Sequence, residues 1–532
     1  MKVKIRLWDI LVGTLEWDKN AGKSVFRYSE EFLDSPYDIS PTLYPKLDKR
    51  RAAFYGNKAT EGLPEFLADS LPDDWGNTLF SKWASDNKIR MDESSALAKL
   101  SFIGKRAMGA LEFEPELEKD TEIQEQIAID ELYVHAMDIL HDREKAVLSP
   151  QEEKTKQRLI RLGTSIGGKH AKGLIAMDSS GNIRSGQIAL PKEFRYYILK
   201  FKEEDEVPTS EIEKIYYDMA TECGIPMMAS QLYPASGTNH FLTERFDRLP
   251  AGEKVHTQTL KALSPTAKDY MNLFWLIDKL HVPAQRKETL FKQMVFNYFA
   301  GISDDHSKNF TFLMKKDGSW DLSPAYDLMF TSNIWNDPSA ITHSLSVWGK
   351  NAYLTPEDFI DFGEDIGIHS SKTMINDIIE VIYSFPQRAQ DMQIDKLWTN
   401  RIWKVIQKLI PAQRKGAIYE TSRNDIKTIL KEKYQEKQIE IIEEEILTTN
   451  GEESGILIHF TVGDKKRTCV TDNETGDICI SPGFIKNGEF NFGTWKTLNG
   501  KPASYTQTRV MSLENKQNLD SSTKCNFRHS PD

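Results

Sequence analysis

The sequence predicts a mixed α/β (α+β) protein whose central part forms two lobes, and three observations lead to this prediction. Apolar residues recur at helical spacing over 286–300, which indicates a helix packed on a core. After this helix, two short apolar runs flank an Asp-Gly pair, which is typical of a hairpin turn. Nearer the N-terminus, residues 195–201 have the apolar pattern of a strand that is covered on both faces.

The chain divides by composition into four predicted parts. Its 532 residues are enough for about three or four domains of typical size. Residues 1–115 mix short strands and helices, and residues 116–250 and 251–425 form the two lobes, the second of them largely helical. Residues 426–532 differ in character, because a charged helix over 427–447 is followed by short alternating strands. This last part is predicted to be a small β-rich appendage.

Composition limits the class of protein. The formal net charge of −11 argues against non-specific binding to nucleic acid, because a polyanion repels a net anion. The four cysteines form no C-x-x-C pair, so we expect no zinc site, and so few thiols suggest a reducing, cytoplasmic location. No run of roughly 18 apolar residues occurs, so we expect neither a membrane span nor a membrane partner.

A cluster of oxygen-bearing side chains surrounds the predicted hairpin. Asp304 lies on the loop that leads to the hairpin, Asn309 enters its first strand and Asp327 follows its second strand. Because a hairpin brings its two open ends together, these three side chains should converge. Carboxylate and amide oxygens suit Mg²⁺, which also takes oxygens from substrate phosphates. The cluster therefore predicts a magnesium and phosphate site.

The order of these elements is that of the catalytic half of a protein kinase, in which a helix, a D-x-x-x-x-N loop, a hairpin and an aspartate follow one another. In that order Asp304 is the base that accepts or orients the substrate hydroxyl proton, and Asn309 and Asp327 hold metal. Asp305 is a rival for the base, but only Asp304 has the five-position offset to Asn309. The alternative is that these are turn residues with local backbone hydrogen bonds. That alternative is preferable for any one residue alone, whereas the ordered set favours the kinase interpretation.

The first lobe offers a lysine and a glycine-rich stretch for the nucleotide phosphates. Lys200 lies inside the predicted strand, where a lysine is costly to bury unless it is paired, and a kinase strand places its phosphate-binding lysine in the same way. The alternative is a lysine that reaches solvent at a strand end. Ser165, Gly167 and Gly168 are small residues that would let backbone N–H groups approach phosphates, although an ordinary hairpin turn is the preferred explanation of this pattern by itself.

Two further segments of this lobe could take part in nucleotide binding. Ser210 and Glu213 have the spacing of a capping box, and Glu213 could instead pair with a lysine such as Lys200. Residues 240–248 resemble a strand that enters a linker between the lobes, which places Glu244, Phe246 and Asp247 where adenine would bind. The alternative for these three residues is an exposed, salt-bridged edge strand.

Several ordered motifs make the chain resemble the HipA family of serine/threonine kinases, which are toxins of bacterial toxin–antitoxin pairs. The resemblance covers roughly residues 1–420 and gives the expected fold as the two-lobed, protein-kinase-like HipA fold. Residues 426–532 match nothing in that family. The motifs that carry the resemblance are residues 62–76, residues 103–113, Ser165-Ile-Gly-Gly, Glu244-Arg-Phe-Asp-Arg248, Asp304-Asp-His-Ser-Lys-Asn309 and Ser323-Pro-Ala-Tyr-Asp327.

The resemblance implies ATP and Mg²⁺ as cofactors and a role for each matching residue. Asp304 would be the catalytic residue, and Asn309 and Asp327 would bind Mg²⁺. Lys200 would bind ATP, Glu244 and Phe246 would contact adenine, and His306 would lie near the phosphates. Ser165 would be the site of an autophosphorylation that inactivates the kinase. Thr164 is an adjacent hydroxyl and a possible second site.

The resemblance also implies a substrate and a partner. Family members phosphorylate a serine of a protein, the best known being an aminoacyl-tRNA synthetase, and are held by a HipB-like helix-turn-helix antitoxin that binds operator DNA. The acidic chain itself is then expected to contact DNA only through that antitoxin. The alternatives are a kinase of lipids or small metabolites, and an ATP-binding co-repressor of a HipB-like protein.

Overall fold

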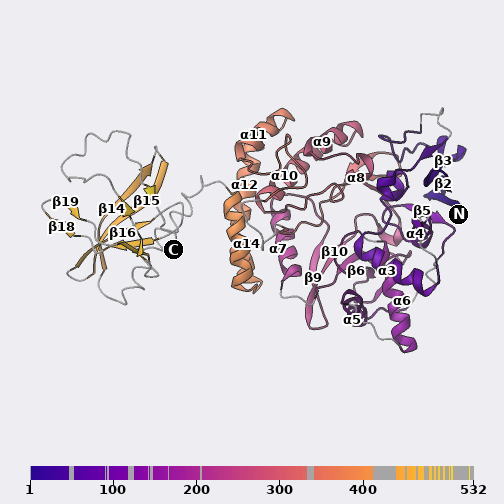
Figure 1. Ribbon diagram of the computed structural model, residues 1–532, viewed down its shortest axis with the longest axis horizontal. Coiled ribbons are helices and arrows are strands. Elements are labelled where there is room, and N and C mark those ends of the chain that lie inside the picture. Colours follow the sequence, from indigo (N-terminus) through magenta and orange to yellow (C-terminus); the bar gives the residue numbers. More distant parts are fainter. Residues whose placement is uncertain are drawn as a thin grey trace. The chain divides into compact units, whose positions relative to one another are not determined.

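The protein is described by a computed structural model whose chain falls into two compact units, residues 1–411 and 412–532 (Figure 1). Within residues 439–527 only the backbone of the strands is described. Backbone and side chains are described for residues 2–46, 53–89, 92, 95–117, 125–141, 143, 148–165, 167–203, 207–331 and 341–410. In this part of the chain, no helix is both long enough and apolar enough to span a lipid bilayer.

The first sheet of the larger unit is antiparallel and has the strand order β4-β3-β2-β1-β5. On β1, Val3, Ile5 and Leu7 are fully buried and alternate with polar residues, the period expected of a strand with one face on a core. The strand β5 returns from far along the chain to pair with β1. The strands are β1 (Lys2–Leu7), β2 (Ile10–Asp18), β3 (Lys23–Tyr28), β4 (Phe54–Tyr55) and β5 (Leu111–Glu114).

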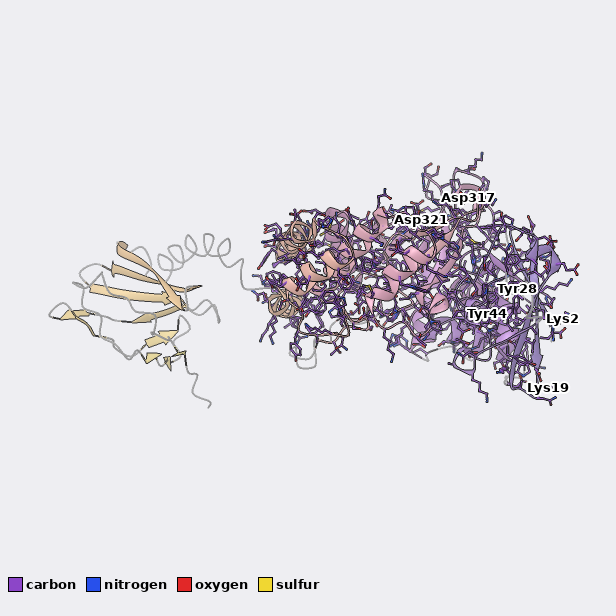
Figure 2. The ribbon with its side chains drawn as sticks, turned by 90° about the horizontal axis from the view of Figure 1, so that it is seen from above. Lys2, Lys19, Tyr28, Tyr44, Asp317 and Asp321 are labelled. Carbon is purple, nitrogen blue, oxygen red and sulfur yellow. The ribbon has the colours of Figure 1, made fainter. Side chains whose placement is uncertain are left out.

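Among the described residues, four short helices follow β3 in the chain and precede β5; the first and last of them contact this sheet, and the third packs on the next lobe. They are α1 (Glu30–Leu33), α2 (Glu65–Ala68), α3 (Asp74–Asp86) and α4 (Ser95–Ile103). The hydroxyl of Tyr28 on β3 donates to the carbonyl of Tyr44 at 2.8 Å, which ties the loop after α1 to the sheet (Figure 2). Burial raises the pKa of Tyr28 well above its ordinary value, so this donor keeps its proton.

A second antiparallel sheet, with the order β7-β6-β8-β10-β9, forms the first lobe. The helix α6 begins with a capping box between Ser149 and Glu152, with Pro150 at its first position. The elements of this lobe are α5 (Ile129–Leu140), α6 (Pro150–Thr164), β6 (Lys172–Met177), β7 (Ile183–Ser185), β8 (Arg195–Lys200), α7 (Thr209–Glu222), β9 (Ser230–Ala235) and β10 (Thr238–Glu244).

The predicted capping box of α7 is wrong. The helix follows Pro208, and no side chain caps its N-terminus. Ser210 and Glu213 are both buried, so Glu213 faces the interior of the lobe instead of the helix end.

The second lobe joins a three-stranded sheet, β11-β12-β13, to a group of helices. The predicted helix over 286–300 is confirmed as α10, and the predicted hairpin as β12 and β13. The elements are β11 (His256–Thr259), α8 (Leu260–Leu263), α9 (Tyr270–Lys279), α10 (Gln285–Phe299), β12 (Thr311–Met314), β13 (Trp320–Leu322), α11 (Pro356–Asp365), α12 (Ser371–Tyr383), α13 (Phe385–Asp391) and α14 (Lys396–Leu409).

Charged side chains hold the hairpin on α10. Asp317 Oδ1 accepts from the backbone N–H of Ser319 at 2.9 Å and shapes the turn. Asp321 on β13, which is labelled in Figure 2, accepts from Arg286 Nε at 2.7 Å. The return strand is therefore tied to the first turn of the helix. One continuous apolar core includes the first sheet, α7 and the helices of the second lobe. The hairpin is therefore part of a rigid unit.

The smaller unit contains a six-stranded sheet with the order β14-β15-β16-β17-β20-β21. Its last four strands are β16 (Lys465–Thr471), β17 (Ile478–Ser481), β20 (Trp495–Thr497) and β21 (Pro502–Ala503). The predicted charged helix is wrong where the structure can be compared, because residues 439–447 belong to the strand β14 (Ile439–Thr449). That strand pairs along its length with β15 (Glu452–Val462), so tertiary pairing prevails over the helical preference of a glutamate-rich segment. Residues 427–438 of the predicted helix lie outside the described residues.

Candidate functional site

Lys200 lies at the meeting point of the two lobes. Its Nζ is 2.5 Å from Glu213 Oε1 on α7 and 2.6 Å from Asp327 Oδ1, which follows β13. Burial by itself would lower the pKa of Lys200, but the two carboxylates outweigh it and raise the pKa above the ordinary value. The lysine is therefore a fixed cation, and it is paired as a buried lysine must be.

Asp327 is an ionised and half-exposed group. The charge of Lys200 holds the pKa of Asp327 well below its usual range. Its side chain is 52% exposed even though it pairs with a largely buried lysine. Its backbone has a φ of 57°, in the left-handed region that few residues other than glycine adopt. Strained backbone of this kind is common where a side chain must point at a ligand.

Lys172 is a second cation at this place that the sequence analysis missed. It is the first residue of β6 and is paired directly across the sheet with Lys200. Its Nζ donates to the carbonyl of Gly167 at 2.7 Å. Burial and the neighbouring charge of Lys200 lower the pKa of Lys172 to about 8. Two lysines opposite each other on neighbouring strands form an arrangement that is suited to binding polyphosphate.

The glycine-rich loop packs on the N-terminus of α3. Asp73, the residue before that helix, accepts from the backbone N–H of Gly168 at 3.1 Å and also binds Lys308 of the second lobe. A Cβ on Gly167 would lie 2.9 Å from Asp73 Oδ2, and a Cβ on Gly168 would lie 2.5 Å from Lys172 Nζ. The Lys172 ammonium could move away from such a Cβ, but Gly168 has a φ of 98°, a backbone conformation that favours glycine. Asp73 was also missed, because nothing in its local sequence shows which lobe it contacts.

The two candidate hydroxyls for phosphorylation are buried in this conformation. Ser165 is 7% exposed, and its Oγ accepts from Gln187 Nε2 at 3.3 Å. Thr164 is 1% exposed and donates to the carbonyl of Ile160. Neither hydroxyl can accept a phosphoryl group unless the end of α6 and the loop after it move.

The structure separates the two rival aspartates of the catalytic loop. Asp305 is 2% exposed, and its carboxylate accepts from Tyr270 Oη at 2.7 Å and from the backbone N–H of Ser344 at 2.8 Å. The Asp304 side chain is 62% exposed and has His306 Nε2 at 3.9 Å from its Oδ1. Only Asp304 therefore presents a carboxylate that a substrate can reach, whereas Asp305 fixes the loop.

The two ends of the hairpin are joined as the sequence predicted. Tyr326, the residue before Asp327, donates to the carbonyl of Lys308 at 2.7 Å and contacts the hydroxyl of Thr311 at 2.7 Å. Asn309 Nδ2 donates to the carbonyl of Asp304 at 2.9 Å, which fixes the amide beside the loop. These contacts bring the loop that carries Asp304 and Asn309 next to the segment that carries Asp327.

The segment between the lobes divides into exposed and buried parts. Glu244 Oε1 accepts from Arg195 Nη1 at 3.0 Å, which is a surface ion pair, although β10 is an inner strand of its sheet. The ring of Phe246 lies 5.5 Å from that of Tyr326, and thus next to the residue before Asp327. This is a suitable position for an apolar wall of a nucleotide site.

Asp247 is fully buried, and its carboxylate is engaged by the protein itself. It accepts from Arg245 Nε at 2.8 Å, from Arg248 Nη1 at 2.8 Å and from the backbone N–H of Gly109 at 2.7 Å. Arg248 also donates to the carbonyl of Ala107 at 2.8 Å. This network joins the N-terminal glycine-rich stretch to the segment between the lobes, so Asp247 is placed to position that segment and not to contact a ligand.

One lobe contains a strand lysine that is paired with a helix glutamate, and the other lobe contains an aspartate that follows a hairpin. Together these features define a two-lobed, protein-kinase-like fold. Family models for the HipA N-terminal domain and the HipA-like C-terminal domain match residues 3–114 and 164–389. The chain belongs to the HipA family.

Curated relatives and one solved structure agree with this assignment. The chain is 26% identical over 220 residues to a putative kinase of Haemophilus influenzae, covering 35% of this chain and 64% of that protein. It is 26% identical over 351 residues to a putative kinase of Sinorhizobium fredii, covering 61% of this chain and 76% of the relative. It is 22% identical over 358 residues to the serine/threonine-protein kinase toxin HipA of Shewanella oneidensis, covering 62% of this chain and 75% of the relative.

The solved structure is that of Shewanella oneidensis HipA with HipB and operator DNA. It superposes with a TM-score of 0.54 at 18% identity and covers 77% of this chain and 96% of that one. At this identity the superposition establishes the fold, and it shows that a HipA chain of this architecture assembles with HipB.

Proposed function

We propose that this protein is an ATP-dependent serine/threonine kinase of the HipA type that transfers the γ-phosphoryl group of ATP to a protein serine. The observation that carries the proposal is the contact of Lys200 with both Glu213 and Asp327. A kinase needs such a lysine, fixed by a helix glutamate, beside an aspartate that binds metal. A protein that had lost catalysis would have no reason to keep this costly buried arrangement.

In the proposed mechanism, positioning and charge supply most of the catalysis. Lys200 and Lys172 bind the phosphates. Asp304 accepts a hydrogen bond from the substrate hydroxyl and orients it for attack, and His306 lies next to it. When bound, Mg²⁺ neutralises negative charge on the phosphates. Phe246 and Glu244 border the adenine, while Asp247 holds their segment in place.

Asn309 and Asp327 fit a magnesium ion that is shared with a nucleotide. No group of three or more His, Cys, Asp or Glu side chains able to hold a metal ion occurs among the described residues. This agrees with the preference of Mg²⁺, which often takes only one or two protein carboxylates together with water and substrate phosphates. Asp327 is ionised and half-exposed. It could bind Mg²⁺ in place of Lys200, because Lys200 would then pair with phosphate.

The buried Ser165 supports self-inactivation by autophosphorylation as part of the proposal. A phosphate on Ser165 would carry a charge near −2 and could not remain in its buried site. The loop would then leave, and Gly167 and Gly168 would lose their contacts with Lys172 and Asp73. The phosphate-binding surface would be dismantled. A protein target such as an aminoacyl-tRNA synthetase and a HipB-like antitoxin partner complete the proposal, the latter by analogy with the Shewanella complex.

The proposal is tested with labelled ATP and Mg²⁺, by comparing wild type with Asp327→Asn and mapping the label by mass spectrometry over residues 159–175. We expect label on Ser165 or Thr164 in wild type only. If neither the chain nor a cell extract is labelled although ATP binds, the protein-kinase proposal fails. A small-molecule kinase or an ATP-binding co-repressor would then be favoured.

The affinity for ATP is expected to fall as the pH rises above 8. The pKa of Lys172 is about 8 in the free protein, and bound phosphates would raise it, so binding takes up a proton above that pH. Above pH 8 the affinity for ATP should therefore fall by up to about tenfold per pH unit. Calorimetry at about pH 9 in two buffers of different ionisation enthalpy should give uptake of about one proton per ATP. Lys172→Met should abolish the uptake, and Lys169→Met, in the same loop, should leave it unchanged. Equal uptake in Lys172→Met would contradict the assignment.

A further inference from the structure

The loop between α6 and β6, named the Ser165 loop, packs on the first turn of α3, where the sequence motif 62–76 ends. Trp75 of that turn donates through its backbone N–H to the carbonyl of Gly168 at 3.4 Å. Its indole Nε1 donates to the carbonyl of Lys172 at 3.0 Å. The start of α3 therefore holds the C-terminal part of the Ser165 loop.

Asp73 occupies the N-cap position of α3, but its side chain makes no capping hydrogen bond. An aspartate at this position usually accepts from the backbone N–H two or three residues later in the chain. In this protein the N–H of Trp75 is already bound by the carbonyl of Gly168. The Asp73 carboxylate is therefore available for other contacts as long as the Ser165 loop is docked.

The two oxygens of Asp73 contact two different lobes. Oδ2 accepts from the backbone N–H of Gly168 in the first lobe at 3.1 Å, and Oδ1 forms an ion pair with Lys308 Nζ in the second lobe. The side chains of the pair are 27% and 42% exposed, so the pair by itself is weak and easily broken. One carboxylate of the N-terminal subdomain thus joins the Ser165 loop to the catalytic loop, residues 304–309.

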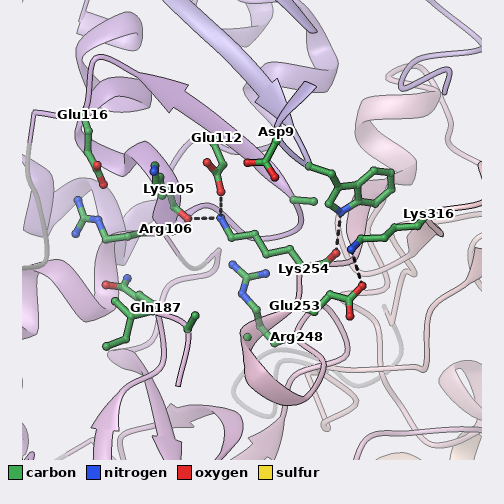
Figure 3. Close-up of a pocket in the computed structure, with 15 residues that line it drawn as sticks. Asp9, Lys105, Arg106, Glu112, Glu116, Gln187, Arg248, Glu253, Lys254 and Lys316 are labelled. Atoms are coloured by element: carbon green, nitrogen blue, oxygen red, sulfur yellow. Dashed lines mark hydrogen bonds and ion pairs between the residues drawn. The ribbon is translucent and has the colours of Figure 1, made fainter. Parts of the chain in front are cut away.

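The other end of the Ser165 loop is held by the first lobe and the N-terminal subdomain. Gln187 Nε2 donates to the carbonyl of Arg161 at 2.7 Å and to Ser165 Oγ at 3.3 Å. Arg106, which lies beside Gln187 on the wall of a cavity (Figure 3), donates to the same Arg161 carbonyl at 3.4 Å. These contacts hold the last turn of α6, whereas the contacts of Asp73 extend to the catalytic loop.

We propose that Asp73 is a positioning residue that transmits the state of the Ser165 loop to the catalytic loop. While the loop is docked, Gly168 binds the free N–H of α3, and Asp73 holds Lys308. When the loop leaves, the N–H of Trp75 loses its acceptor, so Asp73 turns to cap α3 and releases Lys308. The role of the catalytic loop rests on the proposed function, whereas the coupling follows from these contacts alone.

Hydrogen exchange of the full chain, followed by mass spectrometry, tests the coupling and requires no activity. Asp73→Ser keeps a residue that is favoured at an N-cap, so α3 should stay folded, but the shorter side chain is too short to hold Lys308. We expect the amides of residues 306–309 to exchange about threefold faster or more, as for the loss of a partly exposed ion pair. Lys308→Met should have the reciprocal effect on residues 167–172, in the other lobe.

Asp74→Asn is the matched control for Asp73→Ser. Asp74 is exposed in the first turn of the same helix, so its substitution removes the same charge at the same helix end. Exchange of residues 306–309 should then be that of wild type. Equal acceleration in Asp74→Asn and Asp73→Ser, or no acceleration in Asp73→Ser, would overturn the inference.

Displacing the Ser165 loop directly tests the direction of the effect. Ser165→Asp places a charge in a buried site, so the loop should leave. Residues 306–309 should then exchange as fast as in Asp73→Ser, and the variant that combines both substitutions should be no faster. No increase in Ser165→Asp, or a further increase in the combined variant, would show that Asp73 does not transmit the state of the loop.

Single-turnover phosphoryl transfer gives a second readout. Asp73→Ser and Lys308→Met should each lower the rate by about 10–100-fold, because a small displacement of catalytic groups costs about this much. The double variant should be no slower than the slower single variant, since both substitutions remove one contact. Losses that multiply would contradict the inference. If wild type transfers no phosphate, the proposed function fails, and the exchange measurements still decide whether the coupling exists.

Discussion

Replacing Asp304 with asparagine is expected to lower the rate of phosphoryl transfer by about 10²–10⁴-fold, the usual contribution of a group that handles a proton in the transition state. The substitution keeps the shape of the side chain but removes the negative charge that attracts the substrate hydroxyl proton. Because this side chain is 62% exposed and makes few contacts, the free energy of unfolding should not change. A single-turnover assay with labelled ATP and a denaturation curve measure the two quantities separately.

Asp305→Asn is the matched control for this experiment, since the two aspartates are neighbours. Asp305 accepts hydrogen bonds from Tyr270 and from the backbone N–H groups of Ser344 and Leu345. Its substitution should reduce stability by about 1–3 kcal/mol, because an amide nitrogen would face a donor that needs an acceptor. If Asp305→Asn abolished transfer without loss of stability while Asp304→Asn remained active, the roles proposed for the pair would have to be exchanged.

Replacing Asp247 with alanine is expected to destabilise the protein by about 3–5 kcal/mol, because two buried guanidinium groups would lose their shared counter-ion. Asp247 is fully buried, and Arg245 and Arg248 are 2% and 6% exposed, so water cannot replace the carboxylate. The N–H of Gly109 would lose its acceptor as well. Chemical denaturation followed by tryptophan fluorescence gives the change in the free energy of unfolding.

An exposed ion pair is the control for Asp247. Glu16 and Lys2 lie 2.8 Å apart with side chains that are 44% and 57% exposed. Glu16→Ala should therefore cost less than about 1 kcal/mol. A loss of stability in Asp247→Ala no larger than in Glu16→Ala would show that the network does not hold the N-terminal stretch against the lobes.

Stability should also depend on pH through Asp247. Desolvation opposes the charge of this carboxylate, but Arg245 and Arg248 outweigh it and hold the pKa of Asp247 far below its ordinary value. Its contribution to the free energy of unfolding is therefore present above the unfolded-state pKa of about 4 and is lost as the pH falls below that value. Wild type should show this loss between neutral and acidic pH, and the part due to Asp247 should be missing in Asp247→Asn.

The sequence was sufficient for the local elements of the second lobe. The helix α10 and the hairpin β12–β13 follow from apolar spacing and an Asp-Gly turn, which depend only on neighbouring residues. The position of these elements also predicted that the two ends of the hairpin meet, as the contact of Tyr326 with the carbonyl of Lys308 shows. The same local reasoning failed for residues 439–447, because pairing with β15 makes a strand of a segment whose composition favours a helix.

Only the tertiary structure decided which side chains meet across the lobes. Lys172 lies opposite Lys200 because of sheet register, and register follows from pairing between distant strands. Asp73 reaches Gly168 and Lys308 because the packing of α3 on α6 places the start of α3 beside the glycine-rich loop and the second lobe. Asp304 and Asp305 have identical chemistry, and burial alone leaves one carboxylate exposed and makes the other a structural acceptor. The sequence therefore determined the residue types and the local geometry of the site. Long-range packing determined their partners, because contacts between residues distant in the chain leave no periodic pattern in the sequence.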